Sequence, residues 1–238
     1  MNLPPPGDLD ETLGVATLPL FPLRLVLFPG QVLPLHIFEP RYRTMINLCI
    51  ERELPFGVVL MRDDPVDWRR YQNDIDLPHA VGVTAHIRGI ERLADGRMNI
   101  VTLGLHRFRV RQWRFDQPFL QGDVEALPMP GAVARDEVTL LQQQLASYVQ
   151  LLSQIVEADI DLNDMPNDAL ALAYLVGSVL QLPWEDKQRL LELADLPTLY
   201  AAEHELLHKE RMLLGYMAAS EQRIEQQISG PTGSIFPN

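Results

Sequence analysis

The sequence predicts an α+β protein in which a β-rich half precedes an all-helical half. Two observations support this. Between residues 18 and 127, apolar residues come in short runs separated by proline, glycine and Asp-Gly turns, as in strands and hairpins. From residue 135 onward, apolar residues recur every three or four positions, the period of an amphipathic helix. Residues 128–134, rich in proline and glycine, are the predicted linker.

The β-rich half is predicted to span residues 15–127. Its first stretch, LPLFPLRLVLFPG, contains three prolines, which favour edge or bulged strands because proline has no N–H to donate. A short helix is predicted to begin at Pro40, since proline suits the first helical position. Asp95-Gly96 lies between two β-branched runs and predicts a hairpin. The polar segment 62–80 is long for a connection, which indicates a functional or flexible loop.

The helical half is predicted to span residues 135–228 as a bundle of four helices. The second helix, from about Asn167 to Leu182, is apolar nearly all round and is therefore expected at the centre. The third is predicted to span Trp184 to Asp195, and a long last helix begins at Pro197. Residues 1–14 and 229–238 are predicted to be disordered tails.

Composition limits the class of protein. The chain has 238 residues, 47% of them apolar and 22% charged, as in soluble globular proteins, and no apolar run approaches the ~20 residues of a membrane span. One cysteine, Cys49, excludes an intramolecular disulfide and fits a reducing cytoplasm. The net charge is −12, and most of it lies in the helical half, so nucleic acid and anionic lipid are disfavoured partners.

The pentapeptide HELLH, residues 204–208, matches the H-E-x-x-H pattern of zinc hydrolases. In that pattern two histidines one helical turn apart bind Zn²⁺ and the glutamate activates water. A catalytic zinc also needs a third protein ligand in a walled site. The downstream Glu221 is 13 residues beyond His208, about 20 Å along a continuous helix, so it cannot share the ion.

The helical wheel also argues against zinc. A single narrow stripe holds the apolar residues of this helix: Leu199, Leu206, Leu213, Met217, Ile224 and Ile228. His204 and His208 fall near the opposite face, so both side chains are predicted to point into solvent. We interpret HELLH as a chance match and keep zinc hydrolysis as the least favoured alternative.

The stretch HRFRVRQWRF places Arg107, Arg109 and Arg111 on one face of a strand. An arginine row with aromatic residues beside it is typical of a surface that binds single-stranded nucleic acid. It is equally typical of an amphipathic strand whose polar face is solvated, and the net charge of −12 favours this second interpretation. RNA binding through these arginines is the second hypothesis.

No P-loop, G-x-G-x-x-G or G-x-S-x-G motif occurs in the sequence. Cys49 lies on the apolar face of its helix and is predicted to be a core residue, not a nucleophile. The sequence therefore offers no catalytic set, and we expect no cofactor and no enzymatic activity.

The stretch LPLFPLRLVLFPGQVLPLHIFEPRYRTMI, residues 18–46, resembles the opening of the Lon N-terminal, or LON substrate-binding, domain. The similarity continues through 56–61, 81–87 and 95–110, and the leucine-rich segment 190–210 is similar to the last helices of that family. Stand-alone bacterial members look especially similar. The resemblance implies a partly open, PUA-like β-barrel with one short helix, followed by a helical bundle. It further implies recognition of polypeptide substrates and a role in assembly, without the ATPase and peptidase modules of the full-length proteases.

The preferred hypothesis is therefore a non-catalytic module that binds peptides or unfolded proteins. Its predicted contacts are aromatic residues of the 62–80 loop and of the barrel edge: Trp68, Tyr71, Trp113, Phe115 and Phe119. The expected partners are unfolded or hydrophobic polypeptide segments, together with a protease or chaperone component. We expect no membrane partner, a monomer or weak homodimer, and a cytoplasmic location.

Overall fold

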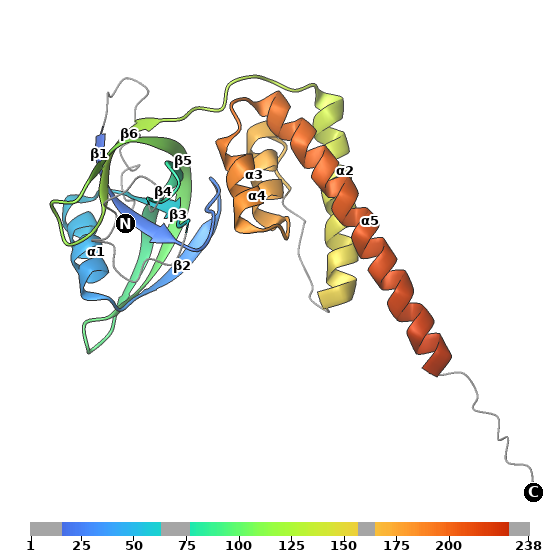
Figure 1. Ribbon diagram of the computed structural model, residues 1–238, viewed down its shortest axis with the longest axis horizontal. Coiled ribbons are helices and arrows are strands. Elements are labelled where there is room, and N and C mark those ends of the chain that lie inside the picture. Colours follow the sequence, from blue (N-terminus) through green and yellow to red (C-terminus); the bar gives the residue numbers. More distant parts are fainter. Residues whose placement is uncertain (1–15, 63–76, 157–164, 229–238) are drawn as a thin grey trace, which may run out of the picture.

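The computed structural model describes residues 16–62, 77–156 and 165–228, and the side chains of all of these except 154–156 and 217–228. A β-sheet with one helix forms one half of the molecule, and four helices form the other (Figure 1). The two predicted tails and most of the 62–80 loop lie outside the described residues.

The sheet contains six strands in the order β2-β5-β4-β3-β1-β6. β1 pairs with β3 in parallel, and all other pairings are antiparallel. Their bounds are β1 Ala16–Leu23, β2 Val32–Ile37, β3 Phe56–Leu60, β4 Val81–Arg92, β5 Met98–Arg114 and β6 Gln121–Ala126. β6 also pairs with the second part of the long strand β5, so the sheet curves strongly. The half predicted as a partly open barrel is thus one strongly curved six-stranded sheet.

The helix start at Pro40 and the hairpin turn at Asp95-Gly96, both predicted from the sequence, are confirmed. Helix α1, Pro40–Arg52, begins at its proline and places Tyr42, Met45, Ile46 and Cys49 in the core beside the sheet. Gly96 has a positive φ of 83° in the hairpin turn between β4 and β5, which a side chain would disfavour.

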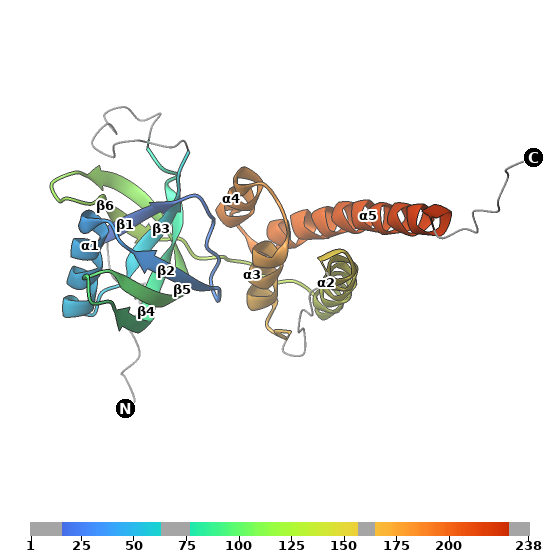
Figure 2. The same ribbon diagram turned by 90° about the horizontal axis from the view of Figure 1, so that it is seen from below.

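The helical half contains α2 Arg135–Val156, α3 Ala169–Val179, α4 Trp184–Glu192 and α5 Leu196–Ile228. α2 and α5 pack along each other, and α5 extends well beyond the end of α2 (Figures 1 and 2). The Asp168 side chain caps α3 by accepting a hydrogen bond from the Ala171 backbone N at 2.8 Å. All four predicted helices are present, each within a few residues of its expected bounds.

One hydrophobic core runs from the sheet half into the helical half. Phe28, in the connection between β1 and β2, is buried against α3 at Gly177. A β-carbon at Gly177 would come to 2.5 Å from the Phe28 ring, so only glycine allows this close approach. None of the described helices is long and apolar enough to cross a membrane.

Candidate functional site

A groove of about 490 Å³ lies between the two halves of the molecule. We call it the interface groove. Its sheet-side wall is the turn Pro29–Gln31, which leads directly into β2. Its helix-side wall is one face of α3 with the residues just before it: Pro166, Asp168, Leu170, Ala171, Tyr174, Leu175 and Ser178. A volume of this size is typical of a ligand-binding site.

The sheet-side wall is shaped by a glycine turn. Gly30 has a φ of 83°, and its backbone N donates to the Gly104 oxygen at 2.8 Å. The Gln31 side chain accepts a hydrogen bond from the Phe28 backbone N at 3.1 Å, and the Gln31 backbone N donates to the Phe28 oxygen. These bonds fix the turn, so the wall is formed before any ligand arrives.

Helix α3 forms the opposite wall because its groove-facing residues are spaced at three or four positions. Ala171 is exposed and Leu175 is half-buried, whereas the intervening Tyr174 is only 8% exposed. Burial raises the pKa of the Tyr174 phenol, and the positive charge of Arg107 opposes this effect. Tyr174 is therefore a neutral hydroxyl group in a mostly apolar wall.

Arg107 fixes the helical half against the sheet half. It is only 3% exposed, and its guanidinium donates to the backbone oxygens of Leu191 at 2.7 Å, Leu193 at 2.9 Å and Pro128 at 2.8 Å. Burial lowers the pKa of this guanidinium. The prediction that Arg107 belongs to a solvated arginine row was wrong. The β4–β5 register shifts beside Arg107, between its pair with Val83 and the next pair, Ala85 with Gly104. The Arg107 side chain is covered there by the linker and by the end of α4.

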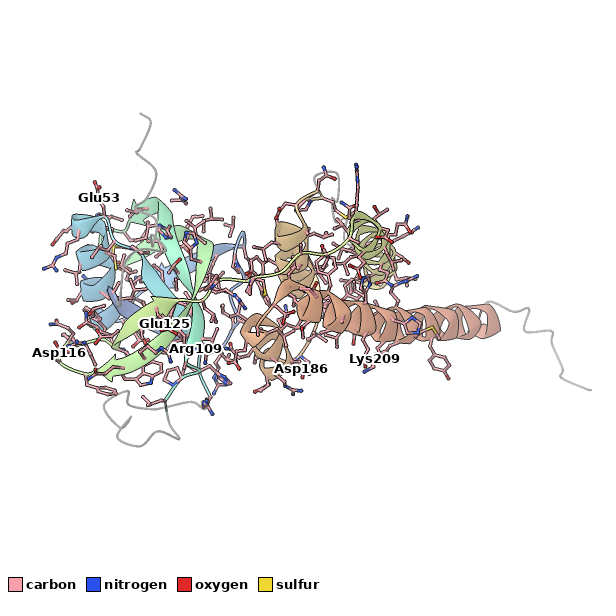
Figure 3. All side chains as sticks on the ribbon, turned by 90° about the horizontal axis from the view of Figure 1, so that it is seen from above. Glu53, Arg109, Asp116, Glu125, Asp186 and Lys209 are labelled. Carbon is pink, nitrogen blue, oxygen red and sulfur yellow. The ribbon has the colours of Figure 1, made fainter. Side chains whose placement is uncertain are left out.

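The other two arginines of the predicted nucleic-acid surface are dispersed. Arg111 is exposed and forms an ion pair with Glu125 at 2.5 Å, and Arg109 is half-buried on β5 opposite that glutamate. Figure 3 shows Arg109 and Glu125 close together on the sheet half. With one arginine buried and one neutralised, the structure lacks a continuous basic face at this place, and it does not favour RNA binding.

Of the predicted aromatic contacts, Trp113 lies near the C-terminal end of β5 and Phe115 directly follows the strand. Phe115 is 44% exposed and Trp113 is half-buried against a small core cluster, whereas Phe119 is 1% exposed and belongs to the main core. A contact role for Phe119 is thus excluded by its burial. Trp68 and Tyr71 lie outside the described residues.

The turn after β5 lies away from the interface groove. Figure 3 places Asp116, in this turn, at the end of the sheet half opposite the helices. The turn is held by Arg114, which donates two 2.7 Å hydrogen bonds to Asp123. Hydrogen bonds from Arg114, and secondly from Thr17, lower the pKa of the Asp123 carboxyl. The structure therefore does not unite Trp113 and Phe115 with the interface groove.

The HELLH segment lies on α5, but the buried face of this helix differs from the predicted stripe. The buried positions of its first part are Leu196, Leu199, Tyr200, Glu203, Leu207 and Leu214. Leu213, expected within the stripe, is 54% exposed. The apolar pattern misplaced the face because Glu203, a charged residue type, is fully buried.

The rotated face changes the placement of one histidine. His204 is half-buried, and its Nδ1 lies 2.7 Å from Oε1 of Gln144 on α2. Burial lowers the pKa of its imidazole, an effect that Glu137 opposes. The prediction of a solvent-facing His204 was thus wrong, whereas His208 is exposed as expected. Within the described residues, no three His, Cys, Asp or Glu side chains gather in a way that could hold a metal ion.

The interface groove was not found from the sequence. Its sheet-side wall comes from a turn at the end of the LPLFPLRLVLFPG stretch, where the sequence gives no sign of a site. Its helix-side wall comes from a helix that is apolar nearly all round. A helix of that composition gives no signal for the side that stays open. The chemistry available in the groove is apolar contact with a few hydroxyl, amide and carboxylate groups, which suits binding.

A family model of the ATP-dependent protease La (LON) substrate-binding domain matches residues 17–209. This match covers most of the chain, and the protein therefore belongs to the LON substrate-binding domain family. Among its relatives are the Lon protease of Anaeromyxobacter dehalogenans (strain 2CP-C) and Lon protease 2 of Myxococcus xanthus, each 27% identical over 234 residues. Each alignment covers 94% of this chain and 27% of the relative. The chain thus spans about a quarter of the length of these relatives, and the part that it does not cover carries their peptidase.

Two solved structures share the fold. The crystal structure of the Lon N-terminal domain protein from Xanthomonas campestris is 26% identical with a TM-score of 0.60, covering 81% of this chain and 98% of that one. The N-terminal domain of the Mycobacterium avium complex Lon protease has a TM-score of 0.61 with the same coverages at 19% identity, which shows the fold alone. Together with the family match, these comparisons support a substrate-recognition module.

Proposed function

We propose that this protein is a non-catalytic polypeptide-recognition module that binds apolar segments of unfolded proteins in the interface groove. The observation that carries this proposal is the groove itself. Its sheet-side turn is held by hydrogen bonds, it is lined mainly by apolar groups, and it lies in a domain of the LON substrate-binding family. Ligand sites of this kind bind by apolar contact and use a few polar groups for orientation.

The associated protease is a partner class that follows from the family. Lon proteases are relatives of this chain, so a protease component is the proposed recipient of the bound polypeptide. The PUA-like character of the sheet half and the cytoplasmic location belong to the same proposal. Trp113 and Phe115 are proposed as an accessory apolar contact at the far end of the sheet, and the same role is proposed for Trp68 and Tyr71.

A charge placed in the groove tests this function. Ala171 is exposed in the helix-side wall, three residues after the capping Asp168, where a glutamate is compatible with the helix start. Ala171→Glu should weaken binding of a permanently unfolded protein, such as reduced and carboxymethylated lactalbumin, by about tenfold or more, because apolar ligand groups would have to desolvate a carboxylate. Fluorescence anisotropy of the labelled unfolded protein measures this affinity.

Ala201→Glu is the matched control. Ala201 is exposed on α5 and does not line the interface groove, so the control adds the same charge to a helix elsewhere. It should bind like the native protein. The proposal is refuted if the native protein does not bind the unfolded chain, or if both variants bind it equally well.

A further inference from the structure

We propose that an extended polypeptide segment adds to the open edge of β2 as a further antiparallel or parallel β-strand and continues from there into the interface groove. The inference rests on the proposed function and specifies the class of ligand: a segment in an extended conformation, recognised through its backbone. The proposed function needs only apolar contact in the groove, and this inference adds backbone hydrogen bonds made by β2.

β2 is the terminal strand of the sheet. In the described part of the chain it pairs with β5 alone. The Gly104 backbone N donates to the Gln31 oxygen at 2.9 Å, so Gln31 and Gly104 form a hydrogen-bonded pair. Val32, the next residue, lies opposite Leu103 and starts the non-bonded positions. Because bonded and non-bonded pairs alternate in an antiparallel ladder, Val32, Pro34 and His36 direct their backbone groups away from β5. These groups form the β2 edge.

The β2 edge carries partial charges that match the backbone of a strand. Val32 and His36 each present an N–H and a C=O, and Pro34 presents a C=O without a donor. Proline is found at this kind of position because its missing N–H costs no ladder bond. None of the described residues outside β2 forms a backbone hydrogen bond with these outward groups. Their complement is the alternating N–H and C=O pattern of an extended chain.

Apolar side chains lie beside this edge on the outer face of the sheet. Val32 on β2 is 59% exposed. Val101 on β5 is 42% exposed and lies opposite Pro34 of β2. Gly89 stands opposite Val101 on β4 and carries no side chain to cover it. Alternate side chains of an added strand would meet this apolar strip.

The polar residue on the strip is held in place. His36 Nδ1 lies 2.7 Å from Oδ1 of Asn99, whose amide nitrogen donates to Glu91 at 2.8 Å. The His36 side chain is thus bonded across the sheet, so its backbone edge remains accessible.

The edge and the interface groove are continuous. The turn Pro29–Gln31 lines the groove and precedes Val32 directly. Six residues of β2 extend about 20 Å at the usual rise of a strand, so an extended segment can occupy both places. A second copy of this chain fits the edge less well, because stable interfaces use about 20–30 residues on each side and β2 offers six.

Backbone N-methylation of a ligand tests strand addition. The probe is a short blocked peptide in which valine and threonine alternate between terminal lysines. If the peptide pairs with β2, methylation of each amide that faces the edge should weaken binding about threefold to tenfold, whereas methylation of the alternate amides should have little effect. Isothermal titration calorimetry measures the series.

A variant pair tests the edge from the side of the protein. Val32→Pro removes an outward N–H, and Val32→Thr keeps this donor and the branched side chain. Val32→Pro should weaken peptide binding by a similar factor of about three to ten, and Val32→Thr should stay close to native affinity. Amide exchange at Val32 and His36 should slow in the native complex, because these donors become bonded.

The possible results separate the two proposals. Equal tolerance of methylation at every position, or unchanged exchange at Val32 and His36, overturns strand addition while polypeptide binding stands. Failure of the probe peptide to bind, when the unfolded protein does bind, also overturns it. Failure of the unfolded protein to bind overturns the proposed function and this inference together.

Discussion

The buried carboxyl of Glu203 should make the stability of the protein depend on pH. Glu203 is 0% exposed on the inner face of α5, and neither of its carboxyl oxygens has a hydrogen-bond partner among the described residues. Burial raises the pKa of this carboxyl well above its ordinary value. The titratable groups that interact electrostatically with the Glu203 carboxyl are Tyr174 on α3 and Tyr200 on α5, and neither supplies a positive charge.

The sign of the effect follows from proton binding. The folded protein holds this proton more tightly than the unfolded chain does, whose glutamate has a pKa of about 4.3. The contribution of Glu203 to the free energy of unfolding is therefore complete below about pH 4.3 and is lost as the pH rises through the pKa of the folded state. Glu203→Gln removes the proton equilibrium and keeps the shape, so the free energy of unfolding of this variant should fall less between about pH 5 and about pH 9.

Glu203→Met removes the unpaired polar group altogether. Burial of an unsatisfied polar group costs about 1–3 kcal/mol, so this variant should be more stable than the native protein by about 2 kcal/mol near pH 5. The difference should increase with pH because the native protein then has to bury a charge or open locally. For a chain of this length, 2 kcal/mol corresponds to a rise of about 4–8 °C in the melting temperature.

Denaturant unfolding followed by circular dichroism, repeated across this pH range, measures all three proteins. The reasoning would be refuted if the native protein and Glu203→Gln lost stability in parallel, because the titration would then come from other groups. It would also be refuted if Glu203→Met were destabilised at every pH, since that would show a partner for the carboxyl.

Three further substitutions and one reaction test the packing. Arg107→Met should lower the free energy of unfolding by about 3 kcal/mol, since three backbone oxygens lose a charged donor; unchanged denaturant midpoints would contradict this. Gly177→Ala should cost about 1–3 kcal/mol by clashing with Phe28, whereas Gly215→Ala, with open space around the position, should gain about 0.4–1 kcal/mol. Burial raises the pKa of the Cys49 thiol to about 12, so a thiol reagent at mildly alkaline pH should label only the unfolded protein; rapid labelling of the folded protein would disprove its burial.

The sequence predicted most of the fold because its signals are local. Pro40 starts α1 and Gly96 turns the β4–β5 hairpin, and each acts through its own backbone geometry. The change of apolar period near residue 135 likewise marks where α2 begins. Such features need no knowledge of what packs against them.

The functional surface depends instead on long-range contacts. Arg107 looked like one member of a solvated row, but its partners come from Pro128 and from the end of α4, which no strand pattern reveals. The buried face of α5 was predicted wrongly because Glu203 is buried, and a hydrophobic pattern counts every glutamate as an exposed residue. Phe119 is an aromatic residue in a polar connection, yet the core covers it.

The arrangement of the two halves bears directly on binding. A groove between separately moving parts would pay an ordering cost for every ligand, whereas a groove with fixed walls does not. Here Phe28 fills the space at Gly177, Arg107 ties three carbonyls across the junction, and the Gln188 side chain donates to the Val81 oxygen at 3.0 Å. These contacts join the two halves that form the interface groove, and none of the residues named lines it. The residues that hold the halves together are therefore the ones that make the groove a preformed site, and the open β2 edge beside it can select extended segments through their backbone.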